Sequence, residues 1–569
     1  MAAILGLAHD LFLSSAALVG GGRVQAAVAE ERLSRRKRDK GFPALAMREC
    51  LRLGGVPLSG LASVAVSWNP ARHLEFPLER LSANARFRGE YLYAVPNMVL
   101  GHSGAPSGRW VEQSFDGLAP RLLFLDHHDC HAANAFYLSP WSEAAYLTAD
   151  GRGEVATVTW GRASREAGLE RGGETRFPHS LGMMYAAVTQ HLGFRPDDEE
   201  WKVMALAGSG APRRTAYERL RPLVEADPES MHVWVDQRHF SFASPEAAGG
   251  RFCTASFTER FGPPRAPDAP IESAHRDLAR AVQDVFEEAL AALLTGLHRR
   301  IPVPRLVAGG GCFMNSAFNG RITRLTPFRE VFISSCPDDA GASVGAALLA
   351  DARLGGRAAA EPPRGDFWGP SYEEDIPATL QRFGLAHRRL DDPAREVAEI
   401  LAGGQLVGWF QGRMEFGQRA LGHRSILADP RHPQSRERLA ATVKPREEFR
   451  PFAPAVLAER VHEWFDVPPA FRAPFMESVQ SFREEVRARV PAVVHVDGTG
   501  RLQTVERSDD PLFHDLLLRF EEKTGVPLLL NTSFNTSGEP IVCTPADAVR
   551  TFFASGLDVL VLGDRLVAK

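Results

Sequence analysis

The sequence predicts an α/β protein built from two domains, and three observations support this fold class. Short apolar runs of strand composition end in glycine-rich or Asp-Gly loops and are followed by segments with helical periodicity. A stretch rich in Gly, Ala and Pro interrupts this pattern at residues 354–370, as a domain boundary does. The 569 residues are 44% hydrophobic and 24% charged, which is typical of a globular protein. Such a length suits three or four average domains, or two large ones of which one is duplicated internally.

The first elements are expected to be strands joined by a tight turn. Residues 4–7 and 16–19 read as strands, the glycines at 20–22 as a turn, and residues 24–29 as a third strand. Many phosphate-binding domains open in this way, but so do many hairpins that bind nothing.

Helices and strands then alternate. Residues 121–125 form a short apolar run, after which Asp126 can cap a helix that reaches residue 136. Residues 144–148 are expected as a strand that ends in Asp150-Gly151. A long helix over residues 273–300 is indicated by apolar side chains at helical spacing, namely Leu278, Val282, Phe286, Leu290 and Leu293.

Two strand–loop–helix units follow, and a similar pattern occurs near the end of the chain. Residues 305–308 lead into the glycines at 309–311, and residues 331–334 lead into a loop before a helix that begins near Ala342. A strand at residues 527–530 precedes the loop NTSFNTSGEP. Ligands of open α/β sheets bind at the carboxyl ends of strands, where these polar clusters lie.

Composition excludes several classes of protein. A formal net charge of −4 gives no electrostatic reason to expect DNA, RNA or an anionic membrane as a partner. The six cysteines are scattered and show no CxxC spacing, so neither a disulfide framework nor a four-thiolate zinc site is expected. The apolar N-terminus has no Lys or Arg before Arg23 and is interrupted by His9-Asp10, unlike a secretory signal. No long apolar run suggests a membrane span, and we expect a cytoplasmic protein.

The sequence DHHDCH is a candidate metal site. His127 and His131 are four residues apart, so on a helix they share a face and can meet one cation. Further ligands must come from other elements, and Asp150 and Asp339 are candidates because each stands at the end of a strand or before a helix. Two histidines and two carboxylates suit Fe(II), Mn(II) or Zn(II). A hydrogen-bonded histidine pair is the alternative, and an HExxH protease is excluded because His128 occupies the glutamate position.

The glycine-rich turn between residues 308 and 315 is a candidate phosphate loop. Gly310, Gly311 and Asn315 are its candidate binding residues, because glycine permits close backbone approach and a helix start offers N–H groups. The pattern is neither GxGxxG nor GxxxxGK[ST], so it indicates neither a Rossmann nor a P-loop site. A plain tight turn explains it equally well.

Residues 412–454 are dense in cations that could bind a dianionic small ligand through charge-assisted hydrogen bonds. These cations are Arg413, Arg419, His423, Arg424, Lys444, Arg446 and Arg450. A nucleic-acid groove is the rival interpretation, which the acidic chain disfavours, and solvated surface charge is another. In the loop NTSFNTSGEP, Gly538 and the small polar residues can cradle a phosphate through backbone N–H groups.

Together these motifs resemble the NodU/CmcH/TobZ-type O-carbamoyltransferases of nodulation-factor and antibiotic biosynthesis. The resemblance runs the length of the chain, through HHDCHAANAF, TADGRGE, GGGCFMNSAFNGRI, DDAGASVGAA, GWFQGRMEFGQRALGHRSILADP, KPREEFRPFAP and GVPLLLNTSFNTSGEPIV. Each segment is long, and all occur in the family's order.

The resemblance implies a fold and an activity. A duplicated Kae1-like domain of the actin/Hsp70/sugar-kinase type would cover residues 1–355, followed by a linker at 356–367. A YrdC-like α/β domain with a twisted open sheet would cover residues 368–569. The YrdC-like domain would form carbamoyl-adenylate from carbamoyl phosphate and ATP with Mg²⁺. The Kae1-like domain would pass the carbamoyl group to a hydroxyl of a small molecule, such as an antibiotic or other natural product, with Fe(II) or a similar divalent metal.

The resemblance also assigns site residues. It makes His127, His131, Asp150 and Asp339 the metal ligands. The expected catalytic residues of adenylate formation are Arg419, Lys444 and Arg450. The expected substrate-binding or nucleotide-binding residues are Gly310, Gly311, Asn315, Arg424, Arg501, Ser533 and Asn535.

One departure from the family concerns the acceptor. The family places His-Asp directly before the SxAAL strand, where this chain has Phe12-Leu13, and His9-Asp10 stands three residues earlier. This predicts a reshaped acceptor pocket that favours less polar alcohols. The general base stays open among His9, Asp10 and Asp129.

Two other functions fit parts of the pattern, namely an enzyme of the threonylcarbamoyl-adenylate, tRNA-modifying type and a non-catalytic actin-like nucleotide-binding regulator. We expect no nucleic acid or membrane partner, and a monomer or homodimer.

Overall fold

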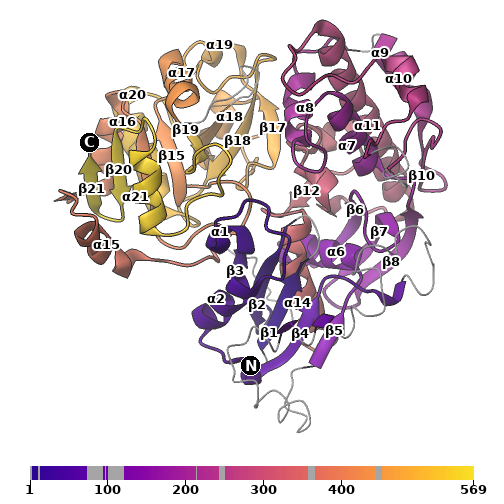
Figure 1. Cartoon of the computed structure of the whole chain (residues 1–569), viewed down its shortest axis with the longest axis horizontal. Coiled ribbons are helices and arrows are strands. Elements are labelled where there is room, and N and C mark those ends of the chain that lie inside the picture. Colours follow the sequence, from indigo (N-terminus) through magenta and orange to yellow (C-terminus); the bar gives the residue numbers. More distant parts are fainter. Residues whose placement is uncertain are drawn as a thin grey trace. The chain divides into compact units, whose positions relative to one another are not determined.

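The computed structural model describes residues 3–9, 13–72, 94–95, 98–99, 121–212, 215–242, 250–356, 365–443 and 452–569. The chain divides into two compact units. The first comprises Met1–Glu30 and Lys40–Pro362, and the second comprises Glu31–Asp39 and Pro363–Lys569. Both units are mixed α/β assemblies (Figure 1).

Two five-stranded sheets organise the described part of the first unit, and they share one topology. The first sheet has the order β3-β2-β1-β4-β5 and the second the order β12-β11-β6-β7-β8. In each, the first three strands along the chain form an antiparallel meander and the last two run parallel to its first strand. The strands are β1 Ala3–Ala8, β2 Ser15–Gly20, β3 Arg23–Ala29, β4 Leu61–Val66, β5 Arg121–Phe124, β6 Glu143–Ala149, β7 Ala156–Ser164, β8 Gly168–Arg176, β11 Arg305–Gly309 and β12 Glu330–Ile333. The unit is therefore an internal repeat.

Two helices occupy equivalent places in the two repeats and pack against each other. The helix α6 (His127–Leu138) follows β5, and α14 (Ala342–Arg353) follows β12. A Cβ on Gly345 of α14 would lie 1.8 Å from the carbonyl oxygen of Cys130 in α6, so only glycine permits this approach. A Cβ on Gly6 in β1 would lie 1.9 Å from the carbonyl oxygen of Ser343 in α14, so this helix packs directly on that strand.

The first unit also contains further helices and one hairpin within its described residues. The 28-residue helix α11 (Ser273–Arg300) spans the range that its apolar stripe predicts. The other helices are α2 Ala44–Gly54, α7 Leu181–His191, α8 Glu200–Ala207, α9 Thr215–Leu220, α10 Ala255–Phe261, α12 Ser316–Asn319 and α13 Ile322–Leu325. The strands β9 (Val224–Asp227) and β10 (His232–Val235) form a separate hairpin.

The described residues of the second unit form one mixed sheet of nine strands in the order β13-β21-β20-β14-β15-β19-β16-β18-β17. Its strands are β13 Arg388–Arg389, β14 Val407–Phe410, β15 Arg424–Ala428, β16 Ala453–Leu457, β17 Ser478–Ser481, β18 Thr499–Val505, β19 Leu528–Ser533, β20 Val559–Leu562 and β21 Arg565–Ala568. Its helices are α15 Ile376–Arg382, α16 Pro393–Ala402, α17 Pro433–Thr442, α18 Val461–Trp464, α19 Glu484–Arg487, α20 Pro511–Thr524 and α21 Pro545–Phe553. The short helix α1 (Glu30–Ser34) leads into the 31–39 segment of this unit.

Several local expectations need correction. Asp126 stands at the start of α6, but its side chain does not cap the helix. The strand β19 continues to Ser533, so the first three residues of NTSFNTSGEP belong to the sheet. A 3-10 turn (Gly311–Met314) precedes the four-residue helix α12 after the glycine loop.

Two further findings concern the cysteines and the helices. The six cysteines, all within the described residues, are free and buried. No helix of the described ranges has the length and apolar character needed to cross a bilayer.

Candidate functional site

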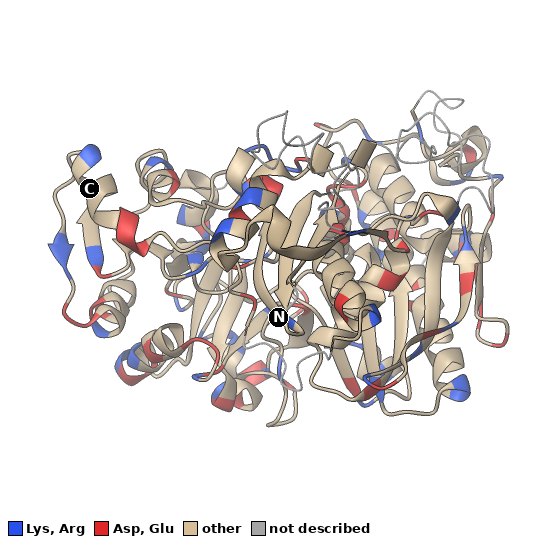
Figure 2. Cartoon of the chain, turned by 90° about the horizontal axis from the view of Figure 1, so that it is seen from below, with Lys and Arg blue, Asp and Glu red and all other residues tan. Residues whose placement is uncertain are grey.

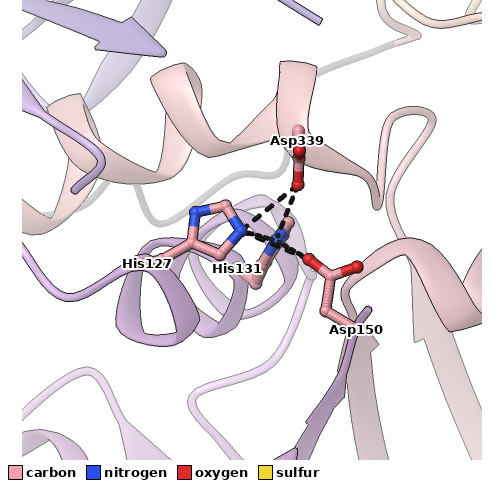
Figure 3. A group of neighbouring side chains, drawn as sticks. All are labelled: His127, His131, Asp150 and Asp339. Atoms are coloured by element: carbon pink, nitrogen blue, oxygen red, sulfur yellow. Dashed lines mark hydrogen bonds and ion pairs between the residues drawn. The ribbon is translucent and has the colours of Figure 1, made fainter. Parts of the chain in front are cut away.

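Four of the predicted site residues converge in the first unit (Figure 3). His127 and His131 lie on α6, Asp150 follows β6, and Asp339 opens the 3-10 turn Asp339–Gly341 before α14. The Nε2 atom of His127 is 3.0 Å from Nε2 of His131, 3.2 Å from Oδ2 of Asp150 and 3.2 Å from Oδ1 of Asp339. The Nε2 atom of His131 is 3.1 Å and 3.7 Å from the same two oxygens. One ligand atom from each residue thus lies within 4.8 Å of the others.

The repeated topology explains why these residues meet. The start of α6 after β5 and the turn with Asp339 after β12 are equivalent points of the two repeats. Asp150 follows β6 as His9 follows β1 in the other repeat. The side-chain amide of Asn134 on α6 donates to the carbonyl oxygen of Cys336 at 2.8 Å, which ties the histidine helix to the loop that carries Asp339.

The two carboxylates of the cluster favour a bound cation. Burial would lower the pKa of His127, but hydrogen bonds to Asp150 and Asp339 and their negative charges outweigh it and raise the pKa to about 10. Burial would raise the pKa of the Asp150 carboxyl, yet hydrogen bonds from both histidines hold it well below its usual range. Two carboxylates therefore stay ionised beside two buried imidazoles.

The donor set fits a divalent metal ion. Ligand atoms bound at ~2.1 Å to one ion are separated by about 3.0 Å in octahedral and about 3.4 Å in tetrahedral geometry. Four of the five separations lie between 3.0 and 3.2 Å, and the fifth is 3.7 Å. Nitrogen and carboxylate donors in this ratio suit Fe(II), Mn(II) or Zn(II).

Neighbouring backbone groups orient these side chains. The Nδ1 atom of His127 lies 3.2 Å from the carbonyl oxygen of Ser67, so Nδ1 carries a hydrogen that it donates, and Nε2 faces the cluster. The Oδ1 atom of Asp150 accepts the N–H groups of Gly151 at 2.7 Å and Gly311 at 3.1 Å, so Oδ2 faces the histidines. The two oxygens of this carboxylate therefore have separate partners, backbone N–H groups for Oδ1 and the histidines for Oδ2.

His128 lies outside the cluster, as the helical spacing predicts. Its Nδ1 contacts the Thr148 hydroxyl at 2.8 Å and its Nε2 contacts the carbonyl oxygen of Ala156 at 3.0 Å. Burial, reinforced by the nearby charge of His127, lowers its pKa well below the ordinary value. His128 is thus a neutral residue that joins α6 to the second sheet.

Glu154 caps the helix α6 in place of Asp126. One oxygen of its buried carboxylate accepts the backbone N–H of His127 at 3.0 Å and that of Asn69 at 2.7 Å. Asp126 instead accepts from the side chains of Asn69 at 2.8 Å and Arg171 at 3.3 Å. Sequence reasoning missed Glu154, because its only signal is its place four residues after Asp150 in TADGRGE.

The candidate phosphate loop lies against the cluster of His127, His131, Asp150 and Asp339. Gly310 has a φ of 94°, and a Cβ there would lie 2.2 Å from the carbonyl oxygen of Ala149 at the end of β6. The side chain of Asn315 exchanges two hydrogen bonds with Gln283 at 2.9 and 3.0 Å and accepts the N–H of Phe318. Gly310 and Gly311 therefore lie beside the cluster, whereas the Asn315 amide caps α12 and joins it to α11.

In the second unit, the predicted binding residue Arg424 is buried and bonded to backbone carbonyl groups. Its side chain is fully buried over the Phe410 ring, 3.6 Å from the ring centre. Its Nη atoms donate to the carbonyl oxygens of Gln411 at 2.5 Å and Gly412 at 3.2 Å. Burial lowers the pKa of this guanidinium to about 10. These contacts hold the loop before β15, and substrate binding by Arg424 stays a prediction.

Further contacts shape that loop, and none of them was predicted. The carboxylate of Glu415 accepts the N–H groups of Leu421 and His423, both at 2.8 Å. Asn531 on β19 donates to the carbonyl oxygen of Ala420 at 3.1 Å, and Gln503 on β18 donates to that of Leu421 at 2.7 Å. Two strands thus hold the segment that follows Arg419.

The other predicted residues of this unit that the structure describes lie on two strands of the sheet and on loops next to it. Arg501 is on β18, Ser533 ends β19, and Arg419 is in the loop between β14 and β15. The Ser533 hydroxyl donates to the side-chain oxygen of Asn535 at 2.7 Å. Lys444 and Arg450 lie outside the described residues.

Comparison with known proteins assigns the family. Residues 3–348 match the model of the carbamoyltransferase N-terminus, and residues 398–569 match that of the carbamoyltransferase C-terminus. An uncharacterized protein of Synechocystis sp. is 35% identical over 614 residues, which cover 100% of this chain and 97% of that protein. Nodulation protein NolNO of Sinorhizobium fredii is 36% identical over 570 residues, covering 99% of this chain and 79% of that protein.

A relative with a named reaction matches a shorter part. The 3'-hydroxymethylcephem-O-carbamoyltransferase of Streptomyces clavuligerus is 34% identical over 308 residues, covering 52% of this chain and 55% of that protein. Since the two family models together match most of the sequence, the chain belongs to the carbamoyltransferase family and is an enzyme of the transferase class.

Proposed function

We propose that this protein is an ATP-dependent O-carbamoyltransferase that makes carbamoyl-adenylate in its second unit and transfers the carbamoyl group in its first. The observation that carries the proposal is the convergence of His127, His131, Asp150 and Asp339 in a chain of the carbamoyltransferase family. The repeated sheets support an actin/Hsp70/sugar-kinase-like, Kae1-like first domain at 1–355. We assign a YrdC-like second domain to residues 368–569, after a linker at 356–367.

The second unit would perform the activation. Water cleaves carbamoyl phosphate to carbamate and phosphate, and a carbamate oxygen then attacks the α-phosphorus of ATP, with pyrophosphate leaving. Several fixed cations are needed around the phosphates during this step. Arg419, Lys444, Arg450 and Arg501 are proposed for that role, with Mg²⁺ bound to ATP. Ser533 and Asn535, whose side chains are joined at 2.7 Å, are proposed to line the same pocket.

The first unit would perform the transfer. His127, His131, Asp150 and Asp339 would hold a divalent cation, which supplies positive charge next to the adenylate phosphate and so makes AMP a better leaving group. The acceptor hydroxyl oxygen attacks the carbamoyl carbon, the bond to AMP breaks, and a base takes the hydroxyl proton. Asp129 is ion-paired with Arg171 at 2.5 Å and Arg353 at 3.7 Å, so we place the base at His9 or Asp10 after β1.

The acceptor is proposed to be a hydroxyl of a small natural product. The name of the Streptomyces clavuligerus relative includes such a compound, a hydroxymethylcephem. Acidic and basic residues are interspersed along the described ribbon of both units (Figure 2), and the formal net charge of −4 gives no electrostatic reason to propose a nucleic-acid partner. Phe12 and Leu13 replace the family's His-Asp pair, which favours a less polar alcohol.

Pyrophosphate release tests this proposal. Carbamoyl phosphate should stimulate pyrophosphate release from ATP by the full chain. His127→Ala should retain that release and lose carbamoylation of an acceptor, whereas Arg419→Ala should lose both. A folded protein in which carbamoyl phosphate gives no stimulation would refute the proposed activation step.

A further inference from the structure

A segment from the first part of the sequence belongs to the second unit. Residues 31–39 pack with Pro363–Lys569, although the chain before and after this segment belongs to the first unit. Leu33 packs against a buried cluster formed by Met414, Ile541 and Cys543. Met414 and Ile541 belong to the two loops that carry Arg419 and Asn535, so the segment lies against both.

Arg35 holds the second of these loops. Its Nη1 donates to the carbonyl oxygen of Ile541 at 2.6 Å and its Nη2 to that of Pro540 at 2.9 Å. Its Nε lies 3.7 Å from a carboxylate oxygen of Asp547 in the first turn of α21. Within the loop, the amide of Asn535 donates to the carbonyl oxygen of Glu539 at 2.8 Å. One guanidinium thus fixes the end of a loop that starts directly after Ser533 and carries Asn535, which are two of the proposed pocket residues.

Arg32 holds the other loop. Its side chain is 5% exposed, its Nη2 donates to the carbonyl oxygen of Gly417 at 3.2 Å, and its Nη1 pairs with Glu31 at 2.8 Å. Gly417 stands two residues before Arg419, and its own N–H donates to the buried carboxylate of Asp366 at 3.0 Å. The backbone on this side of Arg419 is therefore fixed from two directions.

The backbone of the segment is held in an unfavourable conformation. Arg35 and Arg38 both have a φ of 59°, a left-handed conformation that costs energy in residues other than glycine. The N–H of Arg38 donates to the Glu31 carboxylate at 2.8 Å. Such conformations persist where the surroundings over-determine them, and they are often found at functional sites.

We propose that residues 31–39 are a positioning element of the adenylate-forming site, in which Arg35 fixes the loop of Ser533 and Asn535 and Arg32 fixes the loop of Arg419. The inference rests on the proposed function, because it takes these loops to bind ATP. Both arginines act through carbonyl oxygens of the loops. Loss of Arg35 should therefore weaken nucleotide binding and leave the overall fold in place.

Binding of α,β-methylene-ATP to the full chain, measured by calorimetry, tests this inference. Arg35→Ala should raise the dissociation constant about tenfold, as expected for the loss of charge-assisted hydrogen bonds. Added guanidinium at millimolar concentration should restore part of the affinity. Arg35→Lys should restore little, because one ammonium does not reproduce the fork that spans both carbonyl groups.

Arg36→Ala is the matched control, since this neighbouring side chain is 81% exposed and pairs only weakly with Asp39 at 3.5 Å. It should bind the nucleotide like the unmodified protein. If the unmodified protein binds the analogue and folded Arg35→Ala binds it equally well, the inference is wrong. If the unmodified protein itself fails to bind the analogue, the proposed function fails instead. Should Arg35→Ala not fold, Arg35→Lys alone decides, and unchanged affinity in that variant contradicts the inference.

Discussion

The contact between α6 and α14 yields a quantitative prediction about the metal cluster. Replacing Gly345 by Ala adds a Cβ that would lie 1.8 Å from the Cys130 carbonyl oxygen and 3.1 Å from the backbone nitrogen of Asn134. Real Cβ atoms do not approach other atoms closer than 3.0 Å, so the helices must separate by at least about 1.2 Å at this point. The crowded atoms are backbone and have no rotamer in which to move away.

Two opposing terms set the effect on stability. Alanine in a helix interior is favoured over glycine by about 1 kcal/mol, whereas overpacking typically costs about 1–3 kcal/mol. Because backbone atoms cause the clash, we expect a net destabilisation of about 1–2 kcal/mol. Metal binding should suffer more, since α6 carries both histidines, α14 follows Asp339, and metal–ligand distances tolerate only about 0.2 Å.

The assay is Mn(II) or Fe(II) affinity by equilibrium dialysis, with the free energy of unfolding from urea titration. Gly403→Ala is the control, because its Cβ would lie 3.3 Å from its nearest atom, a tight contact that needs only a small local shift, and Gly403 belongs to the second unit. We expect at least tenfold weaker metal binding for Gly345→Ala and unchanged binding for Gly403→Ala. Unchanged affinity together with increased stability for Gly345→Ala would refute the packing argument.

Three further predictions follow from other parts of the structure. Glu154→Ala should weaken metal binding about tenfold and destabilise the fold by about 1–3 kcal/mol, because the N–H groups of His127 and Asn69 lose their acceptor. Unchanged metal affinity in dialysis would contradict this prediction. Asp126→Asn leaves Glu154 in place at the start of the helix, so this variant should retain the metal affinity of the unmodified protein. Burial lowers the pKa of His191 from 6.5 to about 4. The contribution of this residue to the free energy of unfolding is therefore complete above pH 6.5, and up to about 3 kcal/mol of it is lost as the pH falls toward 4. Denaturant titrations at pH 7 and 4.5 should show a smaller loss for His191→Gln than for the unmodified protein, and equal losses would contradict the assignment. In an acceptor panel, apolar macrolide-like alcohols should be carbamoylated better than aminoglycosides, and the reverse preference would contradict the reshaped pocket.

Features set by local periodicity could be predicted from the sequence. The apolar stripe of α11 is continuous over the whole helix, and its predicted range agrees with the structure. His127 and His131 share a helix face because they are four residues apart, and their nitrogens lie 3.0 Å from each other. Asp150 and Asp339 stand at strand and helix ends, where open α/β sheets bring side chains together.

Features that depend on contacts distant in sequence could not be predicted. Asp126 satisfies every local rule for a helix cap, but Arg171 and Asn69 engage its carboxylate and Glu154 takes its place. Arg424 looks like any other cation of the basic stretch, and only the fold shows that it is buried over Phe410. The assignment of residues 31–39 to the second unit has no local signal either, because partners such as Pro540 lie about five hundred residues away.

The proposed metal centre requires four side chains of the first unit to bind a single divalent ion. Anomalous diffraction from crystals grown with Mn(II) or Fe(II) would locate that ion. We predict one strong peak at about 2.0–2.2 Å from Nε2 of His127, Nε2 of His131 and carboxylate oxygens of Asp150 and Asp339. A map without a peak among these four residues, at a metal concentration that supports activity, would contradict the claim.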